Sequence, residues 1–152
     1  MTRKDVLMVD IVVLSELQNH RCCYCGHIMM RHVHVDGKPT PRNAATKDHV
    51  EPRYYGGKTI PENMVAACCL CNNLRGSLEA IAFFNAVQRW FKNEPGLWER
   101  WHKISYDEYR EYELRCKEIH ARQLNGLVIR SPEHAFRHLQ FVTQWHPIPL
   151  RV

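Results

Sequence analysis

The sequence predicts an α+β fold, in which a small irregular β centre is surrounded by helices. Apolar residues recur at helical spacing in the N-terminal and C-terminal parts of the chain, whereas residues 26–57 lose this period and gain turn signals. Two short cysteine groups border the irregular part. A length of 152 residues suits a single compact domain, and 45% hydrophobic with 24% charged residues is typical of a globular protein.

The N-terminal segment predicts a helix near residues 5–19. Its apolar residues recur at helical spacing: Leu7, Ile11, Leu14 and Leu17. A β-branched run over residues 11–13 makes a strand the competing interpretation. Asp10 interrupts the apolar run, no signal-peptide cleavage site follows, and no apolar stretch is long enough to span a bilayer. We therefore expect a cytoplasmic protein with no membrane segment.

The irregular part predicts short strands and loops. The stretch "HVHVDGKPTP", residues 32–41, alternates in polarity around an Asp36-Gly37 turn signal. The formal net charge of the whole chain is +5, which suits an anionic partner such as nucleic acid. Many proteins without such a partner carry as much charge, so the charge alone does not decide the function.

Three further helices are expected after Cys71. Gly76 can end the helix that contains Cys71, and Ser77 can cap the next one. The apolar face of that next helix consists of Ala80, Phe84, Val87 and Phe91. Four tryptophans are expected in the core: Trp90, Trp98, Trp101 and Trp145.

The two C-terminal helices have clear start signals. Ser105 and Glu108 form a capping box, and Asn125-Gly126 marks the end of the helix. Its apolar stripe consists of Tyr109, Tyr112, Cys116 and Ile119. Ser131-Pro132 starts a last helix, with apolar residues Phe136, Leu139 and Val142. We expect residues 1–80 to form the core with the N-terminal helix, and residues 81–152 to be a helical extension packed on it.

The cysteines predict a structural zinc site. Seven cysteines in a reducing compartment are expected to be thiols, and Cys22-x-x-Cys25 and Cys68-x-x-Cys71 have the spacing of two metal knuckles. Four thiolates satisfy tetrahedral Zn²⁺ and leave no position open for chemistry. The alternative is that cysteines are small buried hydrophobic residues, which suits Cys23, Cys69 and Cys116. A thioredoxin-like redox motif is disfavoured, because no βαβ pattern surrounds either pair.

A second pattern lies between the knuckles and extends through the second one. It reads "TKDHVEPRYYGGKTIPENMVAACCLCNNLRG" and contains, in order, Asp48-His49, Pro52, Gly56-Gly57, Asn63, Cys68-x-x-Cys71-Asn72 and Arg75. This combination resembles the HNH endonuclease pattern over roughly residues 21–76. The resemblance implies a ββα-metal fold, in which a hairpin and a helix hold one divalent cation at a phosphodiester. The predicted architecture is therefore a small ββα-metal HNH core stapled by the zinc site and flanked by helices.

The resemblance also assigns roles. It implies that His49 is the general base, that Asp48 and Asn72 hold the catalytic metal, and that Asn63 orients the base through a hydrogen bond. Neighbouring residues of a strand point to opposite faces, which suits Asp48 for metal and His49 for water. An imidazole is well matched to taking a proton at cellular pH.

Three basic residues are expected to contact nucleic acid. Arg75 lies one helical turn after Asn72, where it could touch phosphate. Arg53 and Lys58 belong to the basic loop around the two glycines, which could lie against DNA; the alternative is an ordinary exposed turn.

The expected function is metal-dependent hydrolysis of DNA phosphodiester bonds. Asn72 stands where a histidine would complete the family name, and two oxygen ligands favour Mg²⁺, or Mn²⁺, at the catalytic site. A double-strand cut would call for a homodimer or two events, and a recruiting protein partner is a further expectation. One rival function is a zinc-stapled nucleic-acid-binding module with a non-catalytic site. Another is an interaction protein in which residues 81–152 dock a partner.

Overall fold

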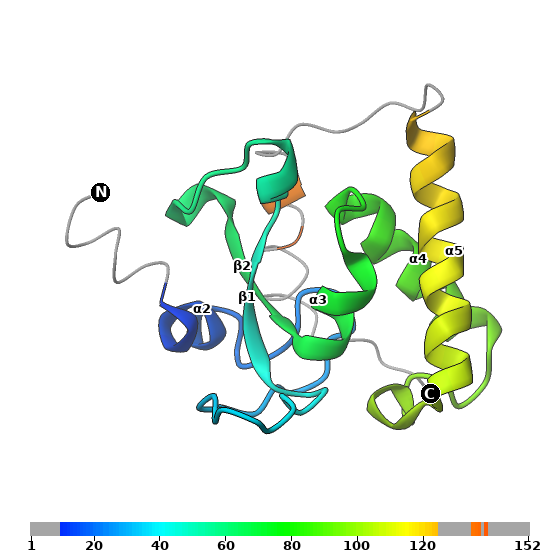
Figure 1. Ribbon diagram of the computed structural model, residues 1–152, viewed down its shortest axis with the longest axis horizontal. Coiled ribbons are helices and arrows are strands. Elements are labelled where there is room, and N and C mark those ends of the chain that lie inside the picture. Colours follow the sequence, from blue (N-terminus) through cyan, green and yellow to red (C-terminus); the bar gives the residue numbers. More distant parts are fainter. Residues whose placement is uncertain (1–9, 125–134, 138, 140–152) are drawn as a thin grey trace.

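The computed structural model describes residues 10–124, 135–137 and 139. Its elements, in chain order, are helix α2 (Ile11–Leu17), strand β1 (Ala45–His49), strand β2 (Met64–Cys68), and helices α3 (Cys69–Arg75), α4 (Ala80–Asn93) and α5 (Tyr106–Leu124). Short 3-10 turns cover Arg53–Tyr55, Pro61–Asn63 and Trp101–Lys103. The α+β class is thus confirmed. Figure 1 shows the β1–β2 pair at the centre, with α2 on one side, α3 on the other and α5 beyond α3.

The sheet is an antiparallel pair that runs from Ala45 opposite Cys68 to His49 opposite Met64. All five residues of β2 are buried. The prediction of strands in residues 32–41 was wrong, because this segment has no strand and contains a turn at Asp36 and Gly37. Its alternating valines do not face a core: Val33 is 75% exposed. Because neither face of the segment packs on a core, its alternating residues do not stabilise a strand pair.

Helix α2 confirms the helical interpretation for residues 11–17, while residues 5–9 lie outside the described residues. Asp10 caps it by accepting a 2.8 Å hydrogen bond from the Val12 N–H. Gln18, which follows the helix, is fully buried. Its side-chain amide donates to the Ala66 carbonyl and accepts from the Ala66 N–H, both at 2.8 Å. It therefore satisfies a backbone position of β2 that has no third strand beside it.

The region after Cys71 partly follows the prediction. Gly76 ends α3 with a positive φ of 55°, as expected. Ser77 does not cap α4, however. Glu79 does so, and its carboxylate accepts a 2.7 Å hydrogen bond from the Ala82 N–H. Leu78 is buried, with 2% exposure, so the chain reaches the core before the helix begins. The predicted apolar face of α4 is buried: Ala80, Phe84, Val87 and Phe91.

Helix α5 begins with the predicted capping box. The Ser105 hydroxyl accepts from the Glu108 N–H, and the Glu108 carboxylate accepts from the Ser105 N–H, both at 3.1 Å. Tyr112 and Cys116 are buried. The predicted signals at Asn125-Gly126 and Ser131-Pro132, together with Val142 and Trp145, lie outside the described residues. Of the last expected helix, residues 135–137 and 139 are described as helical.

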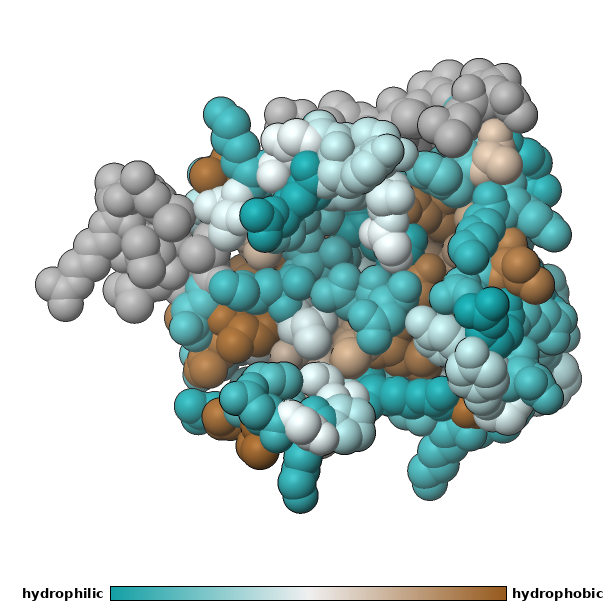
Figure 2. All heavy atoms as spheres, viewed as in Figure 1, coloured by the Kyte–Doolittle hydropathy of each residue, from teal (hydrophilic) through white to brown (hydrophobic). Residues whose placement is uncertain are grey.

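Residues 81–152 contain an aromatic cluster around Trp101. Trp101 is fully buried and lies 5.2 Å from Phe91 and 5.4 Å from Tyr112, measured between ring centroids. The face seen in Figure 2 is largely hydrophilic, and hydrophobic side chains are visible mainly in the hollows between elements. None of the helices in the described residues combines the length and the apolar composition that a membrane crossing needs.

Candidate functional site

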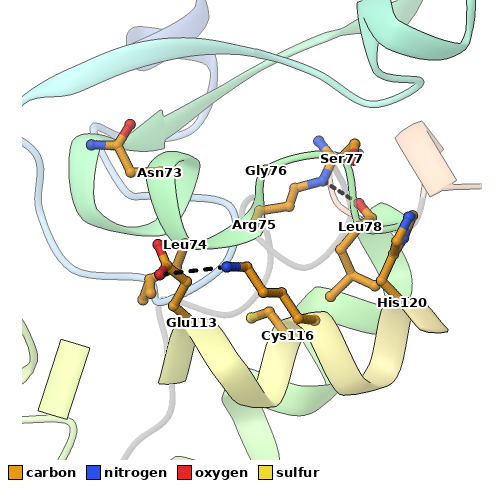
Figure 3. A pocket seen from close by; sticks show the side chains of 10 residues that line it. Asn73, Leu74, Arg75, Gly76, Ser77, Leu78, Glu113, Cys116 and His120 are labelled. Atoms are coloured by element: carbon orange, nitrogen blue, oxygen red, sulfur yellow. Dashed lines mark hydrogen bonds and ion pairs between the residues drawn. The ribbon is translucent and has the colours of Figure 1, made fainter. Parts of the chain in front are cut away.

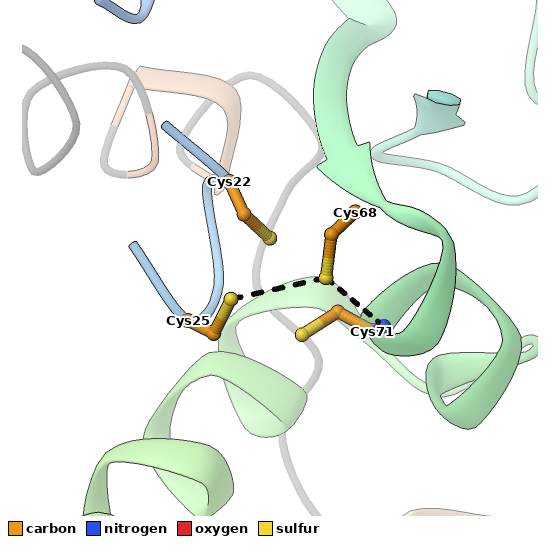
Figure 4. Close-up of side chains that lie close together, drawn as sticks. All are labelled: Cys22, Cys25, Cys68 and Cys71. Atoms are coloured by element: carbon orange, nitrogen blue, oxygen red, sulfur yellow. Dashed lines mark hydrogen bonds between the residues drawn. The ribbon is translucent and has the colours of Figure 1, made fainter. Parts of the chain in front are cut away.

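The structure brings together the four cysteines that the spacing selected. Their sulfur atoms all lie within 4.8 Å of one another, and all four residues are buried (Figure 4). Cys22 and Cys25 come from the turn after α2, Cys68 ends β2, and Cys71 lies in the first turn of α3. The cluster therefore joins the chain before the long irregular segment to the strand and helix after it.

The cysteine cluster fits a structural metal such as zinc. The Cys25 and Cys68 sulfurs are 3.8 Å apart, and a tetrahedral Zn²⁺ with Zn–S bonds of about 2.3 Å places its sulfurs about 3.8 Å apart. The Trp101 indole N–H donates to the Cys71 sulfur at 3.3 Å, the kind of second contact that orients a metal ligand. Burial raises the pKa of the Cys68 and Cys71 thiols. Four thiolates in this interior therefore need a cation to compensate their charge.

Strand β1 directs Asp48 and His49 to opposite sides. Asp48 is buried and His49 is half-buried. The Asn72 amide of α3 donates to the Thr46 hydroxyl at 3.0 Å and to the Lys47 carbonyl at 3.1 Å. Thr46 and Asp48 share one face of the strand. The predicted metal ligands Asp48 and Asn72 therefore both lie at the interface between β1 and α3.

The Asp48 carboxylate is already held by two donors. The Tyr24 hydroxyl donates to its Oδ2 atom at 2.5 Å, and the Arg75 guanidinium donates to the same oxygen at 2.8 Å. Tyr24 lies inside the first cysteine knuckle and Arg75 at the end of α3. The first cysteine knuckle, the strand and the helix therefore meet on one oxygen atom.

The prediction that Arg75 touches phosphate was wrong. Its side chain has no exposed area. Besides Asp48 it donates to the carbonyls of His49 at 2.7 Å, Val50 at 2.6 Å and Leu78 at 2.7 Å; Figure 3 shows the bond to Leu78. Burial is the largest single influence and opposes the charge, but the Asp48 carboxylate, together with Tyr24 and Cys23, raises the pKa of Arg75 overall. Arg75 is thus an internal clamp on the strand that carries His49.

His49 is the last residue of β1 and remains accessible. Its Nε2 atom lies 2.8 Å from the Thr59 hydroxyl oxygen. Partial burial lowers the pKa of His49, and the positive charges of Arg53 and Lys47 lower it further, against the opposing effect of Asp48. The imidazole is therefore neutral at neutral pH, as a general base must be.

Asn63 has a different contact from the one expected. Among the described residues its hydrogen bonds go to the backbone of the loop after β1 and not to His49. Its amide oxygen accepts from the Glu51 N–H at 2.7 Å, and its amide nitrogen donates to the carbonyls of Glu51 at 3.1 Å and Lys58 at 2.9 Å. Asn63 therefore closes the loop over residues 51–58, and this corrects the predicted bond to the base.

The closed loop presents the remaining basic residues to solvent. Arg53 and Lys58 are exposed, as their predicted role requires. A Cβ atom on Gly57 would lie 1.8 Å from the Glu51 carbonyl oxygen, so only glycine fits this turn. The Tyr55 hydroxyl lies 3.2 Å from His120 Nε2, and this contact ties the loop to α5.

Several of these residues escaped the sequence analysis. Tyr24 and Thr59 carried no signal, because their partners are far along the chain or on another element. His120 lines a cleft of about 240 Å³ between α5 and the turn after α3 (Figure 3). The position of His120 depends on how α5 packs against that turn, and the sequence does not reveal this packing.

Comparison with known proteins gives one match, to a family model. Residues 22–78 match the family model described as HNH endonuclease. No curated protein and no solved structure matches the chain. The matched range begins at the first cysteine knuckle and ends just after Arg75, and it contains β1, β2 and α3.

The side chains at the interface of β1 and α3 fit a divalent cation that keeps much of its water. Asp48 offers a carboxylate and Asn72 an amide oxygen, both hard donors of the kind that Mg²⁺ prefers. Asn72 makes its described hydrogen bonds through the amide nitrogen, so its oxygen is not used by them. Both polar contacts of the Asp48 carboxylate within the described residues fall on Oδ2, which leaves Oδ1 for a cation.

Proposed function

We propose that this protein is a metal-dependent HNH endonuclease that hydrolyses phosphodiester bonds in DNA. The observation that carries the proposal is the placement of His49. Its neutral, accessible imidazole ends the strand whose preceding residue, Asp48, shares an interface with Asn72. A base and a pair of oxygen ligands are thus held on adjacent residues of one strand and the helix beside it.

In this proposal His49 takes a proton from the attacking water. The Thr59 hydroxyl can accept the Nε2 proton, since the two atoms are 2.8 Å apart, and Nδ1 then carries the free lone pair. Asp48 and Asn72 would hold Mg²⁺ or Mn²⁺, which when bound stabilises negative charge on the phosphate. Asn63 keeps the loop beside His49 closed.

The exposed positive charges around His49 support DNA as the proposed substrate. Lys47 shares the strand face of His49, and Arg53 and Lys58 lie on the loop that follows; all three are exposed. Cations on both sides of the base are suited to neighbouring phosphates. We further propose that residues 81–152 pack on the core as an extension, since the Phe83 ring lies 4.9 Å from the Tyr24 ring and the Trp98 indole N–H donates to the Cys25 carbonyl at 2.8 Å. A homodimer or a recruiting protein remains a proposal for double-strand cutting.

A second candidate is a zinc-stapled nucleic-acid-binding module without catalysis. The buried pair of Asp48 and Arg75 favours it, because the carboxylate proposed as a metal ligand is neutralised by a guanidinium. This candidate predicts salt-dependent DNA binding and no strand cleavage with any divalent ion.

Incubation of the purified protein with supercoiled plasmid tests the proposal. We expect nicked or linear plasmid with Mg²⁺ or Mn²⁺ and intact plasmid with EDTA. His49→Ala should abolish cleavage with zinc content and circular dichroism unchanged. His34→Ala is the matched control, because the His34 side chain is 68% exposed and its partner among the described residues is the exposed Asp36. Cleavage by His49→Ala at the rate of the parent would overturn the assignment, and DNA binding without cleavage would establish the second candidate.

A further inference from the structure

The carboxylate that would hold the catalytic cation carries no uncompensated charge. Arg75 pairs with Asp48 at 2.8 Å in a region where the two side chains are 0% and 7% exposed. A charge so little exposed is weakly screened by water, so the guanidinium opposes any second cation that approaches the same carboxylate. The attraction that usually draws Mg²⁺ to an aspartate is therefore largely cancelled here.

We propose that the free protein binds the catalytic cation weakly, and that the cation and a DNA phosphate bind to the Asp48–Asn72 site together. This inference rests on the proposed nuclease function and adds that cation binding depends on DNA binding. The cluster formed by Tyr24, Asp48 and Arg75 keeps the affinity of the site for the cation low until the DNA binds.

The shortage of protein ligands supports this proposal. Within the described residues, the cysteine cluster is the one place where three or more His, Cys, Asp or Glu ligand atoms lie together. Asp48 therefore belongs to no such group, and the neutral amide of Asn72 adds no charge. Mg²⁺ in such sites is commonly bound by one or two carboxylates together with substrate phosphates, and water fills the remaining positions. A phosphate oxygen would supply both the missing ligand and the missing negative charge.

Arg75 cannot easily move aside when a cation approaches. Its three other hydrogen bonds, to the carbonyls of His49, Val50 and Leu78, use all three guanidinium nitrogens. Breaking them would leave buried carbonyls without donors, which is unfavourable. The ion pair is therefore a fixed feature of the site, and the cation must bind with the guanidinium in place.

The hydrogen bond from Tyr24 further lowers the affinity of the Asp48 carboxylate for a cation. Its hydroxyl donates to the same Oδ2 atom at 2.5 Å, and the residue is fully buried. A hydrogen bond of this kind withdraws negative charge from the oxygen that accepts it. Its removal should therefore make Asp48 a better ligand, whereas a purely structural role for Tyr24 predicts the opposite.

Coupled binding has a reciprocal consequence that can be measured on DNA. If a phosphate strengthens cation binding, the cation strengthens DNA binding by the same factor. We expect Mg²⁺ to tighten the binding of a fluorescein-labelled duplex to the His49→Ala variant by about tenfold relative to EDTA, measured by fluorescence anisotropy. Counterion competition alone would weaken the complex when Mg²⁺ is added. Equal or weaker DNA binding in Mg²⁺ would overturn the proposal.

The free protein provides the second measurement. In the absence of DNA, electron paramagnetic resonance of Mn²⁺ should show no saturable binding at micromolar concentrations. Tyr24→Phe should tighten Mn²⁺ binding by about fivefold, the factor expected from one lost hydrogen bond. Tyr55→Phe is the matched control, since its hydroxyl contacts His120 and not Asp48. Tight Mn²⁺ binding by the parent, or unchanged or weaker binding by Tyr24→Phe, would contradict the inference.

The two proposals fail in different ways. Absence of plasmid cleavage by the parent would reject the proposed nuclease function. The Mn²⁺ titrations and the anisotropy comparison would still test whether the cation and DNA bind together. Cleavage by the parent, together with micromolar Mn²⁺ binding before DNA is added, would keep the nuclease and reject the coupling.

Discussion

The Arg75 guanidinium lies 2.8 Å from the Asp48 carboxylate and joins the end of α3 to the strand that carries His49. The same guanidinium also donates to the His49 carbonyl at 2.7 Å. The position of the proposed base therefore depends on a buried arginine, which has no exposed area with which to reach DNA.

Loss of Arg75 should destabilise the fold. Arg75→Met leaves the Asp48 carboxylate buried without its counter-charge, and we expect the free energy of unfolding to fall by about 3–5 kcal/mol. Urea denaturation of the zinc-loaded protein measures this change. Arg53→Met is the control, because Arg53 is exposed and should change the value by no more than about 0.5 kcal/mol. Similar losses for the two variants would contradict the clamp role.

The cysteine cluster should hold its metal through four specific residues. Cys68→Ser removes one ligand and also the sulfur that caps α3 by accepting from the Cys71 N–H at 3.4 Å. We expect this variant to lose stoichiometric zinc and helical circular dichroism. Cys69→Ser changes the neighbouring cysteine, which lies outside the cluster, and should retain both. The cluster assignment would be wrong if Cys69→Ser lost zinc and Cys68→Ser kept it.

The pH dependence of cleavage should report the His49 imidazole. Burial and the nearby cations lower the pKa of His49 below its usual value, so the base is protonated only in acid. We expect kcat/KM to rise with pH through an apparent pKa below about 6.5 and then to stay level through neutral pH. Lys47→Gln removes one of the cations and should move the profile toward higher pH. A profile that rises only above neutral pH would exclude His49 as the base.

Asn63 should control the closed loop after β1. Asn63→Ala removes three hydrogen bonds to Glu51 and Lys58, and we expect faster trypsin cleavage after Arg53 and Lys58. The free energy of unfolding should fall by about 2 kcal/mol, since buried backbone groups lose their partner. The control Asn73→Ala affects an exposed amide that contacts the Cys69 sulfur. Equal trypsin sensitivity in parent and Asn63→Ala would show that the loop is held by other contacts.

Local patterns accounted for much of the architecture. The capping box at Ser105 and Glu108 and the apolar face of α4 could be predicted because each depends on residues a few positions apart. The same holds for the zinc knuckles, where a two-residue gap brings two sulfurs to one side of a tight turn. The alternation in residues 32–41 does not produce a strand, because alternating polarity does not show whether a core is present to cover one face.

The sequence by itself therefore determined the family pattern, the four clustered cysteines and the two neighbouring residues Asp48 and His49. Only the tertiary structure decided what surrounds them. Tyr24 and Arg75 meet on Asp48 although they are 24 and 27 residues from it in the chain. Such contacts depend on how a strand, a helix and a metal knuckle pack together, and no local periodicity records that packing. For this reason an arginine with the spacing of a phosphate contact proved to be a buried partner of the carboxylate.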